Sequence, residues 1–421
     1  MINLADLREN PEHYRNSQKL RGADIQLVDD IIKADTTRRE TLQEFEAKRA
    51  EQKTFGKKIA KAPKSEKQEL VKQVGSLAKE VKRLDASANE AQKTLDELLF
   101  KLDNLVEDGV PAGGEDDFEV VRKVGDIPEF DFEVKDHLEI GEAIDGIDMT
   151  RGAKVSGARF YFLKGDLMML EQAMFQLGLQ RALAAGFVPM TTPTLVLPQT
   201  MAGTGFLGEH ADEVYHLEED DLYLVGTSEV ALAGYHANEI LNFKNGFKRY
   251  AGLSSCYRRE AGSYGKDTRG IIRVHQFNKL EMFSYVPVED ATKEHEKLLA
   301  MQEEMLQDLG LSYRVINTAA GDLGSSAAKK YDCEAWIPTQ QTYRELTSTS
   351  NCTTFQARRL KIRERTENGT CSVATLNGTL ATTRWLVALL ETHQNADGSV
   401  NIPEVLQPFM GGKAKIDANR S

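Results

Sequence analysis

Apolar residues recur at alternating spacings of four and three between positions 70 and 102. They are Leu70, Val74, Leu77, Val81, Leu84, Ala88, Ala91, Leu95, Leu98 and Leu102. This heptad spacing predicts a helix with a continuous apolar seam. At about 1.5 Å per residue the helix is about 50 Å long, which is more than most domain cores need. We therefore expect it to project.

A poorer apolar stripe precedes this helix. It runs through Val28, Ile31, Leu42, Phe45 and Ile59. Between the two stretches, Pro63 disfavours helix at the residue before it, and Ser65 is a candidate cap for the second helix. The pattern predicts an antiparallel helical hairpin over about residues 27–105.

The composition changes after Leu105. The segment EDGVPAGGEDDFEV is rich in Gly and acidic residues and has few apolar ones, which is typical of a linker. We place a domain boundary there, between an N-terminal domain (1–106) and a C-terminal domain (107–421).

The C-terminal part mixes short β-like runs with longer helical ones. FEVVRKV, YLVG and GIIRVHQF are examples of the former. DLMMLEQAMFQLGLQRALAAG predicts a helix that Asp166 can cap and Gly186 can end. Because strands and helices do not alternate regularly, an antiparallel α+β sheet is favoured over a doubly wound fold.

The charge is distributed unevenly. The chain has a formal net charge of -12, yet residues 48–83 hold 12 Lys and Arg against 4 acidic residues. This basic segment lies around the tip of the predicted hairpin, where it could contact a polyanion. A structural or dimerising coiled coil with solvated lysines is the other interpretation of the same pattern.

Other bulk features set the class of protein. No apolar run approaches the roughly 18 residues of a membrane span, and the charged N-terminus lacks the apolar core of a signal peptide. A cytoplasmic protein with no membrane partner is expected. The four cysteines are single and far apart, so no zinc is predicted.

GTGFLG, residues 203–208, matches the dinucleotide-binding pattern GxGxxG. Neither the strand that should precede it nor the helix that should follow it is convincing, so we interpret it as a flexible loop. A GxxxxGK[ST] loop does not occur either, so any nucleotide must be held in another way.

Residues 257–281 predict a β-hairpin with a long charged loop. Arg258 and Glu260 share one face of the first expected strand, and Arg273, His275, Phe277, Lys279 and Glu281 alternate along the second. Guanidinium, carboxylate and aromatic groups on one surface suit the phosphates, amino group and base of ATP. A half-exposed hairpin with alternating charges explains the spacing equally well.

The order of residues is more specific than their spacing. Tyr257, Arg258, Glu260, Arg273, Phe277 and Glu281 resemble motif 2 of class II aminoacyl-tRNA synthetases, and the intervening AGSYGKDTRG resembles bacterial seryl-tRNA synthetases. FVPMTTPTLV with Pro193 resembles motif 1, and TLNGTLATTRWLVALLE with Arg384 resembles motif 3. NGTLATTR is one residue shorter than the commoner family pattern and has one Gly fewer. The resemblance covers nearly the whole chain.

The resemblance implies a class II catalytic domain behind an N-terminal coiled-coil hairpin. It also implies ATP-dependent activation of L-serine to seryl-adenylate and transfer to serine tRNA, with selenocysteine tRNA as a further candidate. Arg258, Glu345 and Arg384 are the implied catalytic residues. The implied ATP contacts are Arg258, Arg259, Glu260, Val274, Phe277, Glu345, Leu346, Thr347, Ser348 and Arg384. Glu345 is also the implied ligand of Mg²⁺ carried by the ATP phosphates.

Serine binding is assigned in the same way. The implied residues are Thr227, Ser228, Glu229, Glu281 and Thr379. The hairpin is expected to recognise the long variable arm of serine tRNA, and motif 1 to form a homodimer.

Two other functions stay open from the residues alone. One is a ligase that activates a small amino acid and loads it onto a carrier protein, although such relatives lack the basic hairpin. The other is a non-enzymatic coiled-coil protein that binds RNA. Arg258, Glu260, Phe277 and Arg384 count against it.

Overall fold

The computed structural model describes residues 2–61, 63–208, 211–261, 265 and 267–418. The chain divides into two units, Met1–Asp103 and Asn104–Ser421, each described by itself. The division lies within a few residues of the linker that the composition predicts. No helix in the described part of the chain is both long and apolar enough to cross a membrane.

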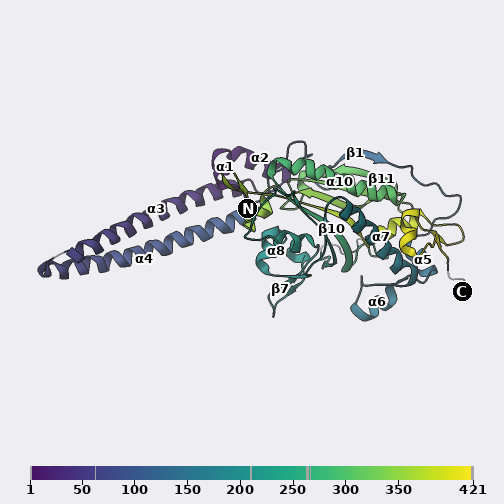
Figure 1. The fold of residues 1–421 in the computed structure, drawn as a ribbon, viewed down its shortest axis with the longest axis horizontal. Helices are drawn as coiled ribbons and strands as arrows, with labels where there is room; N and C mark the ends of the chain where they lie inside the picture. The colour runs from purple at the N-terminus through teal and green to yellow at the C-terminus, as the bar shows by residue number, and fades with distance from the viewer. Residues whose placement is uncertain (1, 62, 209–210, 262–264, 266, 419–421) are drawn as a thin grey trace. The chain divides into compact units, whose positions relative to one another are not determined.

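The described part of the first unit is helical. It contains α1 (Leu4–Glu9), α2 (Pro11–Arg21), α3 (Gln26–Lys61) and α4 (Lys64–Lys101). Helices α3 and α4 pack along each other as a long antiparallel hairpin, so this expectation is confirmed (Figure 1). The expected cap is wrong. Pro63, with φ -65° and ψ 155°, is already the N-cap of α4, so Ser65 lies inside the first turn.

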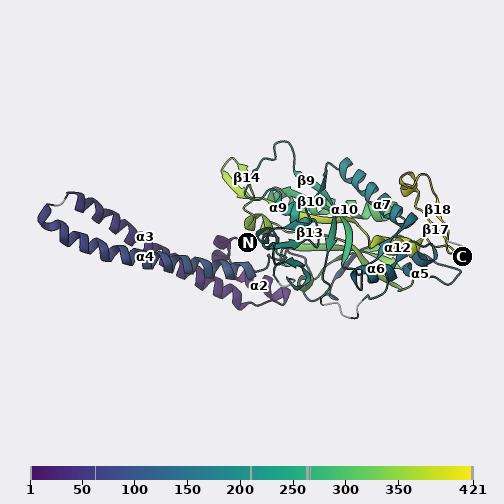
Figure 2. The ribbon, with the colours of Figure 1, turned by 90° about the horizontal axis from the view of Figure 1, so that it is seen from below.

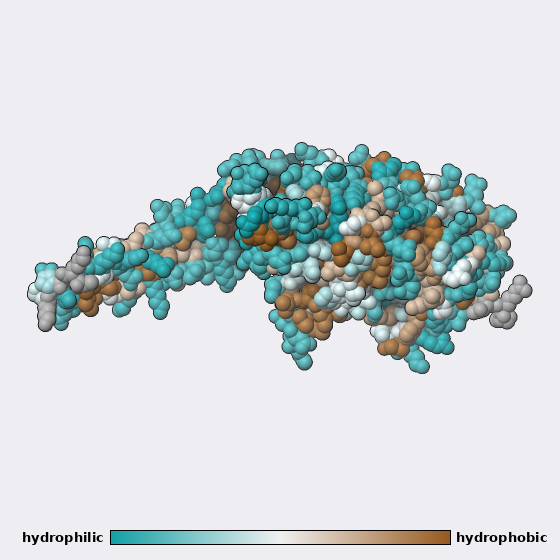
Figure 3. All heavy atoms as spheres, viewed as in Figure 1, coloured by the Kyte–Doolittle hydropathy of each residue, from teal (hydrophilic) through white to brown (hydrophobic). Residues whose placement is uncertain are grey.

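The seam of the hairpin follows the heptad pattern in part. Leu84 and Leu95 are buried as predicted, but farther along α4 Leu99 is buried and the predicted Leu98 is only half-buried. Arg38 Nε donates a hydrogen bond of 2.9 Å to Gln92 Oε1 on the opposite helix. Outside this seam the hairpin surface is mostly hydrophilic (Figure 3). The apolar stripe packs between α3 and α4, and the charged residues of the hairpin face solvent.

An eight-stranded sheet lies at the centre of the second unit, in the order β1-β11-β12-β13-β16-β10-β9-β4. All its pairings are antiparallel except the parallel pairing of β4 with β9. The strands are β1 (Glu119–Val124), β4 (Val188–Thr191), β9 (Lys248–Tyr257), β10 (Gln276–Val286), β11 (Tyr313–Asn317), β12 (Lys329–Ile337), β13 (Thr342–Asn351) and β16 (Ala374–Thr382). The predicted antiparallel α+β fold is confirmed.

Helices and small sheets surround this central sheet. The helices are α5 (His137–Ala143), α6 (Met149–Ser156), α7 (Gly165–Ala184), α8 (Pro198–Thr204), α9 (Glu229–Gly234), α10 (Ala291–Asp308), α11 (Phe355–Arg359) and α12 (Trp385–Thr392). The minor strands are β2 (Ile147–Asp148), β3 (Phe162–Leu163), β5 (Leu195–Val196), β6 (His216–Leu217), β7 (Leu222–Leu224), β8 (Ile240–Leu241), β14 (Arg363–Thr366), β15 (Gly369–Ser372), β17 (Val400–Asn401) and β18 (Lys415–Ile416). Figure 2 shows the same elements from below.

Strand β10 separates the core from the site. Its even-numbered residues Leu280 and Met282 are fully buried in the main apolar core with α7 and α10. A Cβ on Gly178 of α7 would lie 2.7 Å from Leu280 Cδ2, so a larger residue there would require the Leu280 side chain to shift. Because side chains alternate along a strand, Phe277, Lys279 and Glu281 face the opposite side, where the site lies.

Helix α7 ends as the sequence predicts but begins differently. Gly186 has φ 87° and its N–H donates a hydrogen bond to Leu183 O at 3.1 Å, which is a glycine-terminated helix end. Asp166 is not the cap, because the helix already begins at Gly165. The Asp166 carboxylate instead accepts hydrogen bonds from Lys413 Nζ at 2.7 Å.

The GxGxxG segment has no dinucleotide-binding context. Its first glycine, Gly203, is buried near the end of helix α8, where a Cβ would meet Leu360 Cδ2 at 2.4 Å. Gly205 ends that helix in the left-handed region with φ 98°. The expected loop is therefore wrong for Gly203 and Thr204, which belong to the helix, whereas residues 205–208 do follow it as a turn.

Candidate active site

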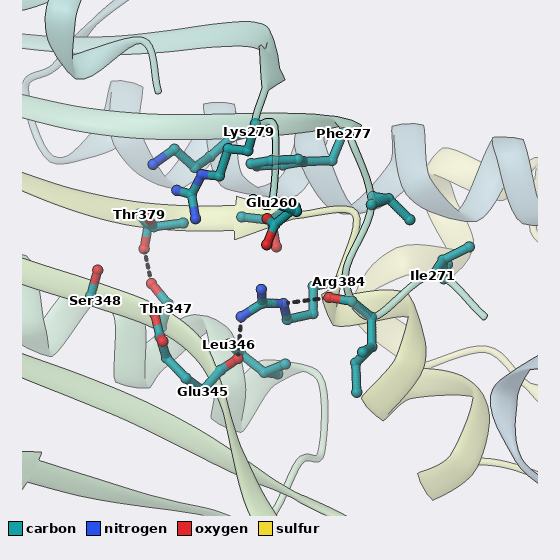
Figure 4. A pocket seen from close by; sticks show the side chains of 14 residues that line it. Glu260, Ile271, Phe277, Lys279, Glu345, Leu346, Thr347, Ser348, Thr379 and Arg384 are labelled. Carbon is teal, nitrogen blue, oxygen red and sulfur yellow. Dashed lines mark hydrogen bonds between the residues drawn. The ribbon is translucent and has the colours of Figure 1, made fainter. Parts of the chain in front are cut away.

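A pocket opens on the site face of the central sheet (Figure 4). The space within it is about 560 Å³, part of which is open to solvent. Its lining comes from strand β10, strand β13, the end of β16 and the loop between β9 and β10. The lining residues are Arg258, Glu260, Ile271, Ile272, Val274, Phe277, Lys279, Glu345, Leu346, Thr347, Ser348, Thr379, Thr382 and Arg384.

The loop between β9 and β10 is longer than the sequence predicts. Strand β9 ends at Tyr257 and β10 begins at Gln276, so Arg258, Glu260 and Arg273 lie outside the strands. Glu260 has φ 54°, a left-handed conformation that no strand contains. The expected strand over GIIRVHQF is wrong before Gln276, because the chain there turns to follow the pocket wall.

Arg258 and Phe277 form one wall of the pocket. The Arg258 guanidinium carbon lies 5.3 Å from the centre of the Phe277 ring, within the range of a cation–π contact. Among the described residues the guanidinium makes no ion pair or side-chain hydrogen bond, so its donors remain open to an anion. Across the loop, Arg273 Nη1 and Glu260 Oε2 form an ion pair of 3.0 Å.

Arg384 enters the pocket from the start of helix α12. Its Nε donates to Ile272 O at 3.0 Å and its Nη1 donates to Glu345 O at 3.1 Å (Figure 4). Trp385 is fully buried and its Nε1 donates to Leu346 O at 3.0 Å. These bonds fix the direction of the guanidinium and attach it to strand β13.

Glu345 presents a carboxylate to the pocket. Within the described ranges the side chain makes no ion pair or hydrogen bond. The enclosing walls disfavour its charged form, but Lys330, Arg384 and Arg258 outweigh them and hold the pKa of Glu345 below its ordinary value. The group is therefore ionised and available to a cation.

Glu281 and Thr379 meet across β10 and β16. They are directly opposite each other in the ladder, next to a register shift after Leu280, and Thr379 Oγ1 donates to Glu281 Oε2 at 3.0 Å. Such irregularities often re-aim side chains beside sites. Although motif 3 is one residue shorter than the commoner pattern, Thr379 reaches Glu281.

Thr227, Ser228 and Glu229 are buried and do not line the open pocket. Glu229 begins helix α9, and its Oε1 accepts a hydrogen bond of 2.7 Å from Gln356 Nε2. Burial, followed by the charge of Glu281, raises the pKa of Glu229 to about 7. The two carboxylates therefore interact electrostatically.

Comparison with known proteins identifies the family. Residues 1–106 match the seryl-tRNA synthetase N-terminal domain, and residues 213–393 match the class II tRNA synthetase core domain (G, H, P, S and T). A serine–tRNA ligase of Clavibacter michiganensis is 66% identical over 413 residues, covering 98% of this chain and 97% of the relative. The chain belongs to the seryl-tRNA synthetase family.

Solved structures agree with this membership. The seryl-tRNA synthetase of Pyrococcus horikoshii complexed with ATP has a TM-score of 0.93 and 38% identity, covering 99% of this chain and 100% of that one. The cytoplasmic serine–tRNA ligase of Naegleria fowleri in complex with AMP has a TM-score of 0.87 and 34% identity, covering 98% of this chain and 96% of that one. Neither the carrier-loading ligase nor the non-enzymatic RNA-binding protein is supported by these matches.

The pocket differs from the sequence expectation at several residues. Arg259 was expected at ATP but is exposed and does not line the pocket. Ile271, Ile272 and Thr382 line it without having been expected there. Strand alternation places Lys279 on the site face, but no motif assigns it a role.

Gln302 of helix α10 supports the site from behind. Its Nε2 donates to Thr347 Oγ1 at 3.0 Å, Ser348 O at 2.7 Å and Thr379 O at 2.8 Å. Thr347 Oγ1 also donates to Thr379 O. One fully buried amide thus joins the two strands that border the pocket, a role no sequence motif signals.

Proposed function

We propose that this protein activates L-serine with ATP and transfers the seryl group to serine tRNA. The observation that carries the proposal is one pocket with two ends. One end has an open guanidinium, an aromatic ring and an ionised carboxylate. The other end is lined by Thr379, whose hydroxyl donates to the buried carboxylate of Glu281. Membership of the seryl-tRNA synthetase family suggests ATP as the ligand of the first end and serine as the ligand of the second.

The nucleotide fits the first end. Phe277 offers a flat face for adenine, and Glu260 lies beside it to accept the adenine amino group. Arg258 is assigned to the α-phosphate and Arg384 to the γ-phosphate, with backbone at Val274 and Leu346 alongside. Two cations at the ends of the triphosphate hold it bent and leave the α-phosphorus open to attack.

Magnesium fits the same end. Glu345 supplies an ionised, unpaired carboxylate beside the expected phosphates, and Ser348 supplies a hydroxyl in the pocket lining. Carboxylate and phosphate oxygens are the ligands that Mg²⁺ prefers. A bound ion there would neutralise charge on the leaving pyrophosphate. Among the described residues no three His, Cys, Asp or Glu side chains form a metal cluster.

Serine is assigned to the second end. Glu281 and Thr379 would contact its ammonium and hydroxyl, with Thr227, Ser228 and Glu229 completing the polar surroundings. A pocket built to hydrogen-bond the hydroxyl rejects alanine, because its own polar groups would be left unpaired.

The chemistry needs positioning more than a protein nucleophile. A serine carboxylate oxygen attacks the α-phosphorus, a new P–O bond forms and pyrophosphate leaves. A terminal ribose hydroxyl of the tRNA then attacks the seryl carbonyl and AMP leaves. Arg258 offsets the negative charge that develops on the α-phosphate in the first step.

The hairpin is the proposed tRNA-binding element. Lys53, Lys57 and Lys58 of α3 and Lys67 and Lys72 of α4 are exposed near its tip. Lysines suit a phosphate backbone read by shape, as expected for the long variable arm. On this basis residues 1–106 form the tRNA-binding domain and residues 107–421 the catalytic domain.

A homodimer in the cytoplasm is the proposed setting. Helix α7 and strand β4 carry motif 1, and β4 is an edge strand of the sheet. Leu183 and Val188 are 61% and 55% exposed, and Pro193 follows the strand. Apolar side chains at an unpaired edge favour a second copy.

Pyrophosphate exchange with all twenty amino acids tests the proposed function. Serine alone should support rapid exchange between pyrophosphate and ATP. An equal response to threonine or alanine would overturn the serine assignment. Charging of purified serine and selenocysteine tRNAs by the same preparation then identifies the acceptors.

A further inference from the structure

A lysine is buried beside the proposed serine end of the pocket. Lys279 is 7% exposed, although lysine is rarely buried unless paired. Its Nζ lies 2.7 Å from Glu281 Oε2. Figure 4 shows its side chain beside Thr379. The function proposed above gives Lys279 no task, so its burial needs another explanation.

The hydrogen bonds of Glu281 are divided unequally between its two oxygens. Oε2 receives both the Lys279 ammonium and the Thr379 hydroxyl. Within the described residues Oε1 has no hydrogen-bond or ion-pair partner. Lys279 and Thr379 therefore fix one edge of this buried carboxylate and leave Oε1, on the other edge, to a further donor.

We propose that Lys279 is a positioning residue for the amino-acid substrate: it holds Glu281 so that Oε1 accepts from the substrate ammonium. This inference rests on the proposed function and adds a residue to it. Lys279 acts through Glu281 and does not itself react.

The charge of Lys279 matters because a second carboxylate is near. Several groups face Glu229 of helix α9. They are Glu281 and Lys279 of strand β10, Arg258 of the loop after β9, Cys352 after strand β13 and Gln356 of helix α11. Of these, Lys279 and Arg258 are the cations, and both lower the pKa of Glu229, which burial raises to about 7. Without Lys279, two acidic groups would share the buried region with less compensation.

Kinetics of the full-length protein test the proposal. Lys279→Met keeps an unbranched side chain of similar length and removes its positive charge. Its KM for serine in pyrophosphate exchange should rise about tenfold or more, while its KM for ATP stays within about twofold of wild type. The acid limb of kcat/KM for serine should move to higher pH. Lys413→Met removes a lysine paired with Asp166 elsewhere and should change neither KM.

A double-mutant cycle separates positioning from general structural support. Glu281→Gln removes the charge that Lys279 holds, so adding Lys279→Met to it should change the serine KM by less than about twofold. Equal effects of Lys279→Met in both backgrounds would overturn the proposal. So would a parallel rise in the KM for ATP, which indicates a phosphate contact.

A folding defect is handled by a conservative variant. If near-ultraviolet circular dichroism shows that Lys279→Met is unfolded, Lys279→Arg decides. It keeps the charge, and a serine KM within about threefold of wild type supports the proposal, whereas a tenfold rise contradicts it. Wild-type protein without serine-dependent exchange would instead refute the proposed function. Wild-type exchange with an unchanged serine KM in Lys279→Met refutes only the role of Lys279.

Discussion

Phe277 is the residue whose role in the nucleotide site is simplest to isolate. Its ring lines the pocket under the Arg258 guanidinium. Stacking of a base on an aromatic ring is worth about 1–3 kcal/mol, so Phe277→Ala should raise the KM for ATP about five- to 150-fold. The KM for serine should change little. Phe277→Tyr keeps the ring and should remain near wild type, and a similar loss in both variants would argue against stacking.

Glu229 gives the folded protein a distinctive pH dependence. Its pKa rises from 4.5 to about 7 through burial and the charge of Glu281. The folded state therefore holds a proton that the unfolded state has released between these values. Stability from this group is present below pH 4.5 and is lost as pH rises towards 7. Glu229→Gln should show a smaller loss of unfolding free energy than wild type between pH 5 and pH 8 in urea titrations.

Comparing wild type with Glu229→Gln isolates the contribution of Glu229, because all other titratable groups are the same in the two proteins. His295, whose pKa burial lowers to about 4, has the opposite sign: its contribution grows as pH rises from 4 to 6.5. The His295 contribution should be equal in wild type and in Glu229→Gln. Identical pH profiles for wild type and Glu229→Gln would show that Glu229 is not protonated in the folded protein near neutral pH.

Residue types and spacing predict part of this site. Strand alternation places Phe277, Lys279 and Glu281 on one face. In the structure Phe277 and Lys279 line the pocket, and the buried Glu281 is paired with Lys279. The same reasoning failed for Glu260, whose left-handed backbone is set by the loop. Spacing also cannot reveal the bond between Thr379 and Glu281, which depends on a register shift between two strands distant in sequence.

At the scale of elements, helix α10 is attached to the site through one side chain. Gln302 is fully buried and donates to backbone carbonyls of β13 and β16. Gln302→Leu would leave these buried carbonyls without that donor, so the free energy of unfolding should fall by about 1–3 kcal/mol. The KM values for serine and ATP should both rise, since Ser348 and Thr379 move apart.

A matched change in the same helix provides the control. Within the described residues Gln307 Nε2 donates one hydrogen bond, to Tyr313 Oη at 2.8 Å, and Gln307 does not line the pocket. Gln307→Leu should lower stability by about 1 kcal/mol and leave both KM values unchanged. Equal kinetic effects of the two substitutions would mean that Gln302 has no special link to the site.

Elements with strong local patterns were predictable, and those set by tertiary contacts were not. The heptad seam correctly predicted the helical hairpin, and Gly186 correctly predicted the end of α7. Residues 270–275 look like a strand but turn, because the Ile271 N–H donates to His137 Nε2 of helix α5 at 3.1 Å. Gly270, with φ 69°, leaves the room that His137 needs. Such a partner, 134 positions away, leaves no local sequence signal.

At the scale of the whole molecule, the two units allow the two reaction steps to be separated. All residues that line the pocket belong to the unit Asn104–Ser421. Deleting residues 41–88 and joining the ends by a short Gly-Ser turn keeps the Arg38–Gln92 bond at the base of the hairpin. Serine-dependent pyrophosphate exchange should stay within about twofold of wild type. Charging of serine tRNA should fall by about a hundredfold or more, because the phosphate contacts are removed.

A charge reversal that preserves the hairpin distinguishes tRNA contact from loss of a helical support. Lys57, Lys58 and Lys72 are exposed near the tip, so Lys57→Glu, Lys58→Glu and Lys72→Glu together should leave helicity unchanged by circular dichroism. The KM for tRNA should rise in this variant, and its dependence on salt should become weaker, because fewer phosphates are neutralised. Full charging by the deletion variant would refute tRNA recognition by the hairpin. Unchanged tRNA kinetics in the charge-reversed protein would instead confine recognition to other residues of the hairpin.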